Sequence, residues 1–506
     1  MREFHSDGVA TRAGDTLPPI RFGTDGWRAR IAHDFTFASL ERAAQAYATF
    51  LKHEHAEAFA NRPSPNDTTN SSITDKQKQC VVVGYDRRFL SEEFARRTSE
   101  VLRGNDFNVL LFSEDVPTQL VSWAVRELGA RGGICITASH NPPQFNGFKI
   151  KAPWGGSAAP ETTAAIETLV DAEPVRRASS PSGTSPNTST GELSACTESY
   201  RRAVAAYVDI ERLRATPSRI VIDSMHGSGG HWLEGFLRGG NIKAETIRAN
   251  RDPLFGGVNP EPIDLNLGAL KNRVRETNAL VGLATDGDAD RLGAVNDAGE
   301  TMTMHEVVPL ILLHLARNRG MTGGVVRTFS QSVLTRRIAA AHNLPLYDTP
   351  IGFKYIAELM LREDILIGAE ESGGIGVRGH IPERDGILNS LLLLEAIVTA
   401  GKSPTQMVKE MHTEFGEFYF GRIDLHQEVS HGQALVRRLA EHSPANIGGY
   451  EVADVLTTDG TKLLFADESW LLFRQSGTEP ALRIYAEATS THKMRELLEA
   501  GRKLAT

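Results

Sequence analysis

The chain has 506 residues, 41% of them hydrophobic and 23% charged, and its net charge is −8 at pH 7. A chain of this length is too long to fold around a single hydrophobic core. At roughly 100–200 residues per domain, we expect three or four domains. The charge is mildly acidic and there is no block of lysine and arginine. This argues against nucleic acid or an acidic membrane as a partner, and a phosphate ligand would need local pockets of cations.

Three cysteines, Cys80, Cys135 and Cys196, form no Cys-x-x-Cys pair, and their odd number argues against a disulfide framework. The apolar runs around Cys80 and Cys135 predict that these two thiols are buried. The N-terminus lacks the apolar core of a signal peptide, and the apolar stretches around 306–316 and 387–400 are too short or too interrupted to cross a membrane. We expect a cytoplasmic enzyme, and the sequence leaves open whether it is a monomer or a homodimer.

Residues 35–53 carry apolar side chains at helical spacing and predict a helix. Residues 54–79 are polar and aperiodic, which is typical of a surface insertion. A second polar stretch, 174–199, is rich in serine, threonine, proline and glycine and predicts a linker that follows the first domain.

Three segments then share one plan of alternating strands and helices, which predicts mixed α/β layers in three similar domains. Their first strands are expected at 81–84, 219–223 and 324–327, and their last apolar strands at 132–137, 279–285 and 364–369. Each last strand runs into a polar loop, and the three loops span 138–147, 286–291 and 370–376. Because α/β folds build their sites beyond strand ends, we expect these loops to share one cleft.

The tail from about residue 413 differs from these segments and predicts a smaller α+β domain. Its strands are expected near 419–425, 451–456, 462–465, 469–473 and 482–487, and its helices near 431–442 and 491–504. It carries a fourth polar loop, 474–480.

The first loop offers a nucleophile, Ser139, in the run Thr137-Ala138-Ser139-His140-Asn141-Pro142. Taken alone, this run reads as a turn of turn-forming residues. It is not a Gly-x-Ser-x-Gly nucleophile elbow, and adjacent side chains such as Ser139 and His140 point apart in an extended chain. Acyl transfer is therefore disfavoured, whereas phosphoryl transfer to the hydroxyl stays open.

The second loop carries Asp286, Asp288 and Asp290 at alternate positions. Three carboxylates can converge on one hard cation, and oxygen ligands favour Mg²⁺ with room left for a phosphate oxygen. An EF-hand does not fit, because Arg291 stands at the sixth position and Asp297 at the twelfth. Arg291 is placed to neutralise the phosphate.

The third and fourth loops suit a sugar phosphate. Glu370 and Ser372 can bind sugar hydroxyls, which both donate and accept hydrogen bonds, whereas His380 on the residues alone reads as structural. The fourth loop combines an arginine, hydroxyls and a glycine into an anion cradle, which Arg483 extends. Its candidate phosphate-binding residues are Arg474, Ser476, Gly477, Thr478 and Arg483.

With these four loops the chain resembles the α-D-phosphohexomutase family, and within it the phosphoglucomutases/phosphomannomutases. The resemblance runs from Phe22-Gly23-Thr24-Asp25-Gly26-Trp27-Arg28 to the loop 474–480. It implies four domains around a central cleft. They are a tail (1–18), domain I with the serine loop (19–175), a linker or insertion (176–199), domain II with the metal loop (200–300), domain III with the sugar loop (301–412) and domain IV with the phosphate loop (413–506).

The resemblance also implies residue roles. Ser139 would be phosphorylated at rest and would bind Mg²⁺ together with Asp286, Asp288 and Asp290. Arg28, His140 and Lys149 would lie at the reacting phosphoryl group, with Lys149 as proton carrier. The implied substrate-binding residues are Arg291, Lys354, Glu370, Ser372 and His380, and the implied distal phosphate site is the fourth loop.

The implied reaction interconverts hexose 1-phosphate and hexose 6-phosphate through a bound 1,6-bisphosphate. Glu371, between Glu370 and Ser372, favours glucose, whereas Asp25 also occurs in glucosamine-type members, so mannose and glucosamine phosphates remain alternatives. Glucose 1,6-bisphosphate is then expected as intermediate and activator. The rival hypotheses are a sugar phosphatase that uses the same phosphoserine and a non-catalytic sugar-phosphate sensor.

Overall fold

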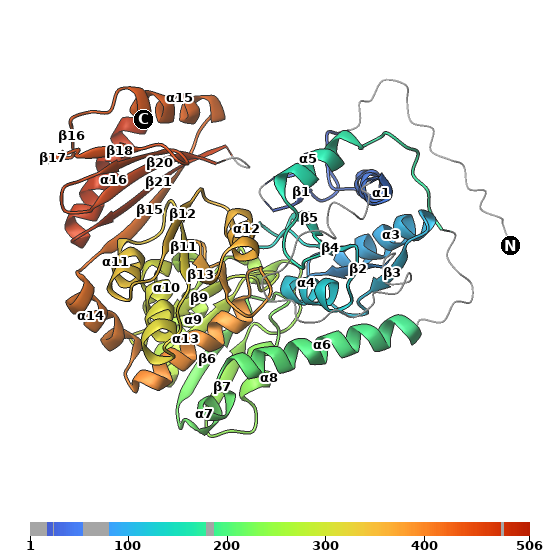
Figure 1. Cartoon of the computed structure of the whole chain (residues 1–506), viewed down its shortest axis with the longest axis horizontal. Coiled ribbons are helices and arrows are strands. Elements are labelled where there is room, and N and C mark those ends of the chain that lie inside the picture. The colour runs from blue at the N-terminus through green and yellow to red at the C-terminus, as the bar shows by residue number, and fades with distance from the viewer. Residues whose placement is uncertain (1–17, 24, 54–79, 179–186, 477–479) are drawn as a thin grey trace.

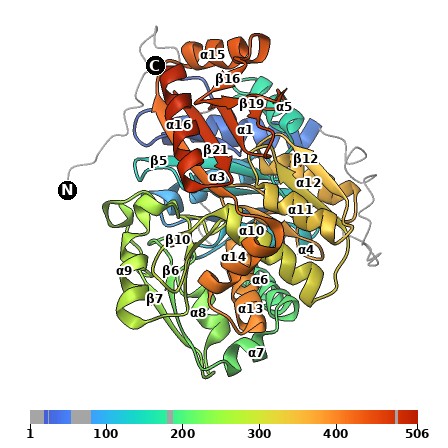
Figure 2. The ribbon, with the colours of Figure 1, turned by 90° about the vertical axis from the view of Figure 1, so that its left-hand side faces the viewer.

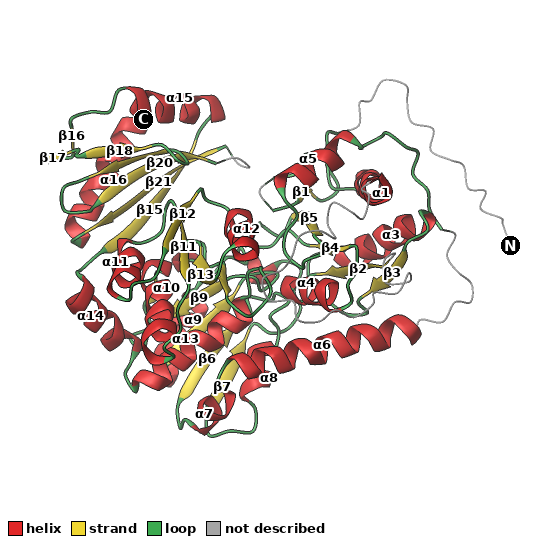
Figure 3. Ribbon diagram, in the orientation of Figure 1, coloured by secondary structure: helices red, strands yellow, loops and turns green. Residues whose placement is uncertain are grey.

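The computed structural model describes residues 18–23, 25–53, 80–178, 187–476 and 480–506 (Figure 1). The predicted insertion 54–79, most of the N-terminal tail and the candidate residues Gly477 and Thr478 lie outside these ranges. The described chain forms three α/β domains and a smaller C-terminal domain, as predicted (Figure 3).

The first three sheets repeat one topology, which confirms the shared plan. In each, a central strand pairs in parallel with two neighbours, and a fourth strand joins antiparallel to the third. The strands are β2 (Cys80–Tyr85), β3 (Asn108–Leu111), β4 (Gly132–Ile136) and β5 (Phe145–Lys151) in domain I; β6 (Arg219–Asp223), β7 (Lys243–Ile247), β8 (Val281–Thr285) and β9 (Leu292–Val295) in domain II; and β11 (Gly324–Thr328), β12 (Leu346–Thr349), β13 (Ile365–Ala369) and β14 (Ile375–Val377) in domain III. Two short edge strands, β1 (Trp27–Arg30) and β10 (Thr301–Met302), extend the first two sheets.

Helices cover the sheets and thereby bury the central strands on both faces. The strand β2, for example, is buried along its whole length. Domain I has α1 (Phe37–His53), α3 (Ser91–Gly104), α4 (Thr118–Glu127) and α5 (Pro160–Thr168); domain II has α7 (Ile210–Ala215), α8 (Trp232–Leu237) and α9 (Gly268–Thr277); domain III has α10 (Met304–Leu313), α11 (Val333–Ala341), α12 (Phe353–Arg362), α13 (Gly386–Ala400) and α14 (Pro404–Phe415).

The C-terminal domain has an antiparallel sheet in the order β15-β21-β20-β19-β18, covered by two helices (Figure 2). Its elements are β15 (Tyr419–His426), α15 (Val429–Glu441), β16 (Asn446–Ile447), β17 (Tyr450–Glu451), β18 (Asp454–Leu456), β19 (Thr461–Leu464), β20 (Trp470–Gln475), β21 (Ala481–Ala488) and α16 (Thr491–Ala505). The strand expected at 451–456 is divided between two sheets, since β17 pairs with β16 and β18 pairs with β19.

The linker predicted over 176–199 is wrong in its second half. A helix, α6 (Asn187–Tyr207), begins there and lies along domains I and II (Figure 1). Leu193, Cys196, Tyr200 and Val204 are buried in the core that α4 also contributes to. These side chains recur at helical spacing, but the serine and threonine between them and Gly191 before them make the segment look like a linker.

All three thiols are buried, as expected for Cys80 and Cys135, and burial raises the pKa of Cys80, Cys135 and Cys196 to about 12 in each case. Within the described ranges, no single helix is long and apolar enough to cross a membrane. Only α13 and α14 together reach the required length, and they meet at a bend of 79°.

Candidate active site

Three of the polar loops occupy equivalent positions in the three repeated domains. Each connects the third strand of its sheet to the antiparallel fourth strand, between β4 and β5, β8 and β9, or β13 and β14. The loops also touch one another. Gly287 of the second loop lies against the backbone of Ser139, and Leu292 donates its N–H to the carbonyl of Gly373 at 3.0 Å. The repeat therefore brings the predicted nucleophile, metal and sugar loops into one site.

Ser139 is held in the left-handed backbone region, with φ of 52°. A non-glycine residue rarely adopts this conformation, and such strain is concentrated at functional sites. Its N–H donates to Thr137 Oγ1 at 2.8 Å, and its Oγ donates to Asp286 Oδ2 across the domain boundary, also at 2.8 Å. His140 Nδ1 lies 3.4 Å from the same hydroxyl. The serine side chain is thus aimed at the aspartate loop.

A buried arginine that the sequence did not single out shapes the serine loop. The Arg88 guanidinium donates to the carbonyls of Ser139 and Asn141, both at 2.6 Å, and to two further carbonyls of the same loop, those of Pro142 and Phe145. Its Nε donates to Asp86 Oδ2 at 3.1 Å. Since nothing in the sequence links residue 88 to residues 139–145, only the folded chain reveals this role.

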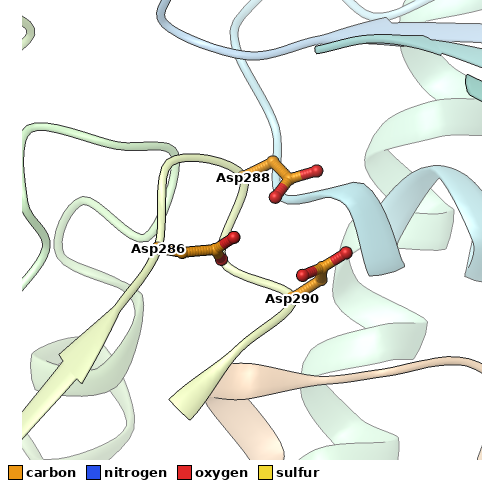
Figure 4. A group of neighbouring side chains, drawn as sticks. All are labelled: Asp286, Asp288 and Asp290. Carbon is orange, nitrogen blue, oxygen red and sulfur yellow. The ribbon is translucent and has the colours of Figure 1, made fainter. Parts of the chain in front are cut away.

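The three aspartates form the only cluster of potential metal ligands found among the described residues, with ligand atoms all within 4.8 Å of one another (Figure 4). Asp286 uses both oxygens in hydrogen bonds, to Ser139 Oγ and to the N–H of Arg291. Within the described chain, by contrast, Asp288 Oδ1 and Asp290 Oδ1 are buried without a hydrogen-bond partner. Buried carboxylate oxygens need a partner, so this donor set fits a hard divalent cation such as Mg²⁺.

The charges around the three aspartates also favour a cation at this position. Burial, together with the charges of Asp288 and Asp290, raises the pKa of Asp286 well above its ordinary value. Like charges so close together favour either a proton or a cation between them. The second oxygens of Asp288 and Asp290 are paired with a lysine: Lys149 Nζ lies 2.8 Å from Asp288 Oδ2 and 3.0 Å from Asp290 Oδ2. The two aspartates therefore present one oxygen each to the lysine and leave the other for a cation.

Lys149 is buried, and it also lies 2.9 Å from Asp25 Oδ2. Burial lowers the pKa of Lys149, but the charges of Asp25, Asp288 and Asp290 outweigh it and raise the pKa above its ordinary value. In this arrangement the side chain holds its proton and acts as a cation. Its predicted role as proton carrier remains a prediction.

Arg384 is a second residue that the sequence did not reveal. It pairs with Asp25 of domain I, with Asp290 of domain II at 2.9 Å, and with Glu370 of its own domain at 3.7 Å. One guanidinium thus joins the first motif, the metal loop and the sugar loop. Burial raises the pKa of Glu370 to about 7, so its carboxyl exchanges protons near neutral pH.

The remaining cations lie around this centre. Arg28 donates to Asn141 Oδ1 at 2.9 Å, and Arg291 lies 3.6 Å from Glu261. Lys354, in the first turn of α12, helps to line a cavity of about 390 Å³ that domain I residues such as Asp25 also line. Ser372 is half-buried in the β13–β14 loop.

Domain IV also faces the site. Arg474 on β20 and Arg483 on β21 lie directly opposite each other in the antiparallel sheet. Burial, followed by the positive charges of Arg291, Arg28, Arg483 and Lys149, lowers the pKa of His140 well below its ordinary value. The charge of Arg483 in domain IV thus contributes to the lowered pKa of a residue of domain I. The other described residue of the predicted cradle, Ser476, is buried beside these strands.

His380 packs differently from the other candidates. Its Nε2 lies 2.8 Å from Asp385 Oδ2, and its ring stacks on Trp123 with centroids 5.4 Å apart. Asp385 in turn begins α13 by accepting the N–H of Leu388. These contacts agree with the structural role that the residues alone favour, and a role of His380 in substrate binding remains a prediction.

Gly287 provides a steric test of this geometry. A Cβ at this position would lie 2.4 Å from the Ser139 carbonyl oxygen, so Gly287→Ala must push the metal loop away from the serine loop. A displacement of about 1 Å at reacting groups costs roughly 10²-fold in rate, and we expect kcat to fall by that order. Steady-state rates would check this, with Gly268→Ala, where a Cβ meets nothing within 4 Å, as the control. Equal rates for the two variants would contradict the placement of the loops.

Comparisons with protein families and with individual known proteins agree with the four-domain fold. Family models described as phosphoglucomutase/phosphomannomutase match residues 68–177 (alpha/beta/alpha domain I), 198–299 (domain II), 304–415 (domain III) and 428–504 (C-terminal domain). The chain therefore belongs to the phosphoglucomutase/phosphomannomutase family of α-D-phosphohexomutases, whose members are isomerases that transfer a phosphoryl group within a hexose phosphate.

Particular relatives match nearly the whole chain. A phosphoglucomutase/phosphomannomutase of Thermococcus kodakarensis is 31% identical over 96% of this chain and 98% of its own. A probable phosphoglucosamine mutase of Methanothermobacter thermautotrophicus is 30% identical over 96% of this chain and 97% of its own. The crystal structure of a putative phosphomannomutase from Thermus thermophilus is 38% identical, covers 97% of this chain and 99% of its own, and superposes with a TM-score of 0.81.

Proposed function

We propose that this phosphohexomutase interconverts hexose 1-phosphate and hexose 6-phosphate through a phosphoserine at Ser139. The observation that carries the proposal is the strained Ser139, whose Oγ donates to Asp286 Oδ2 at 2.8 Å beside two further buried aspartates. A nucleophile next to a cation site is the arrangement that phosphoryl transfer needs.

In the proposed reaction, phosphoserine 139 gives its phosphoryl group to a hydroxyl of the hexose monophosphate. The bound 1,6-bisphosphate turns over, and its other phosphoryl group returns to Ser139. Arg28, Arg291 and Lys149 hold positive charge around the transferring group, and Arg474 with Arg483 binds the distant phosphate. Mg²⁺ held by Asp286, Asp288 and Asp290 would offset the charge that develops on the phosphoryl oxygens.

Glucose phosphates are the proposed substrate, on the strength of the Glu370-Glu371-Ser372 run. Mannose phosphates are the second candidate, because relatives similar over nearly the whole chain are named phosphoglucomutase/phosphomannomutase and putative phosphomannomutase. Glucosamine phosphates are the third, since another such relative is named a probable phosphoglucosamine mutase. Glucose 1,6-bisphosphate is the proposed activator.

The test supplies glucose 1-phosphate, Mg²⁺ and a trace of glucose 1,6-bisphosphate, and measures glucose 6-phosphate and free phosphate. We expect glucose 6-phosphate with little free phosphate. Free phosphate without glucose 6-phosphate would identify a phosphatase. If neither product forms, the result would favour the non-catalytic sugar-phosphate sensor. Rates with mannose 1-phosphate and glucosamine 1-phosphate, measured in parallel, decide the preferred sugar.

A further inference from the structure

One carboxylate, that of Asp459, joins domain IV to domain III at the edge of the site. Asp459 lies in the turn between β18 and β19, just before Gly460, whose φ of 93° closes the turn. Its Oδ1 accepts a hydrogen bond from Arg474 Nε at 2.9 Å. Its Oδ2 accepts one from the backbone N–H of Ile351 in domain III at 2.8 Å. Both oxygens are therefore engaged, each by a different domain.

The two partners lie in two loops with different expected roles: the family resemblance implies substrate binding by the loop of Lys354, and the proposed function assigns the distant phosphate to Arg474. Ile351 lies between β12 and α12, three residues before Lys354. Arg474 lies near the end of β20, where the strand leads into the predicted phosphate cradle. Asp459 thus connects the substrate loop of domain III with the phosphate-binding arginine of domain IV.

The chemistry of the contact determines what Asp459 can do. An arginine has one N–H on Nε and four on its terminal nitrogens, in one rigid plane. Because Asp459 takes the Nε donor, it sets the orientation of that plane, and the terminal nitrogens carry the donors suited to bidentate binding of phosphate. Asparagine would keep only one acceptor oxygen and would turn an N–H₂ group toward a second donor.

We propose that Asp459 is a positioning residue for the hexose phosphate: it orients Arg474 and fixes this guanidinium against the loop of Lys354. The inference rests on the proposed function and deepens it, since it assigns the coupling of these two loops to one side chain. Asp459 itself touches neither the serine nor the aspartate cluster in the hydrogen bonds and ion pairs described, and it acts through its two partners.

Domain IV has other contacts with domain III that leave these loops alone. Glu468 pairs with Arg336 and Arg337 of α11. Lys462 donates to the Phe329 carbonyl at 2.8 Å. Glu468→Gln therefore weakens the docking of the two domains without touching Arg474 or Ile351. It is the matched control that separates docking from positioning.

The experiment compares Asp459→Asn, Asp459→Glu and Glu468→Gln in the full-length protein. Loss of one hydrogen bond between charged groups lowers affinity by about tenfold or more. We therefore expect Asp459→Asn to raise the KM for glucose 1-phosphate by that factor and to change kcat less. Asp459→Glu keeps the carboxylate and should lie nearer to wild type, and Glu468→Gln should leave KM within about twofold. Thermal melting checks that all variants fold.

Binding of glucose 6-phosphate is measured in parallel by calorimetry, so that the result does not depend on turnover. The Kd should rise with Asp459→Asn in step with KM. An unchanged KM and Kd, or an equal rise with Glu468→Gln, would overturn the positioning role. If the wild-type protein shows no mutase turnover, the proposed function fails, and the Kd values for the wild type and Asp459→Asn still decide whether this residue positions the phosphate site.

Discussion

Ser139→Ala is expected to lower the rate of glucose 1-phosphate conversion by at least about 10⁴-fold, as the removal of a covalent nucleophile does in other enzymes. The physical reason is that alanine has no hydroxyl to carry the phosphoryl group. The Ser139 hydroxyl reaches Asp286 Oδ2 at 2.8 Å from a strained backbone position that aims it there. The rate is measured in an assay coupled to the oxidation of glucose 6-phosphate.

The control is Ser99→Ala. Ser99 is also buried in domain I, but its hydroxyl donates to the Ala95 carbonyl within α3 at 2.9 Å, so its loss should leave the rate near that of wild type. Intact mass adds an independent readout. The wild-type protein should carry one phosphoryl group and Ser139→Ala none. Full turnover of Ser139→Ala, or a fully active wild type without phosphate, would disprove the phosphoserine mechanism.

The second large effect concerns the aspartate cluster. Asp286→Asn, or removal of divalent cations by a chelator, is expected to lower turnover by about 10³-fold, because a bound cation supplies several kcal/mol of charge stabilisation in the transition state. The chelated wild type should recover when Mg²⁺ is added, whereas Asp286→Asn should not.

The thermal stability of the metal-free protein should not fall when Asp286 is replaced. Burial and two neighbouring carboxylates raise the pKa of Asp286, which means that its charge is unfavourable in the metal-free protein. Asp286→Asn should therefore melt at the same temperature as the metal-free wild type, or higher. Added Mg²⁺ should raise the melting temperature of the wild type and not of this variant.

The control for the second prediction is Asp264→Asn, at a surface carboxylate of domain II that binds Lys271 and Thr301. This variant should keep both the activity and the Mg²⁺-dependent shift in melting temperature. A metal site at the cluster would be contradicted if Mg²⁺ did not change the melting temperature of the wild type. It would also be contradicted if Mg²⁺ still raised the melting temperature of Asp286→Asn.

Much of the fold was predictable because buried strands leave a strong local pattern. The strands expected at 81–84, 219–223 and 324–327 correspond to β2, β6 and β11 within one residue at each end. The pattern is weaker where polar residues interrupt it. The first turns of α6 therefore read as a linker, and the strand expected at 451–456 is really two strands in two sheets.

The site was predictable only in part. Ser139, the three aspartates and Glu370 stand at the ends of strongly patterned strands, and the structure brings them together. Arg88, Arg384 and Asp459 could not be found in this way. Each acts on groups distant in sequence, and an isolated arginine or aspartate in a loop has no periodicity that distinguishes it from a solvated one.

The sequence by itself determined the three repeats, the order of the four loops and the chemical type of each group in them. These features depend on local patterns that can be recognised in the sequence without knowledge of the fold. Only the tertiary structure decided how the loops meet: through the carbonyls gathered by Arg88, the three carboxylates joined by Arg384, and the two domains bridged by Asp459. The physical reason is that hydrogen bonds and charges act over a few ångströms in space, whatever the separation along the chain. Ser139 is thus a candidate nucleophile in the sequence and an oriented one only when domain II is packed against it.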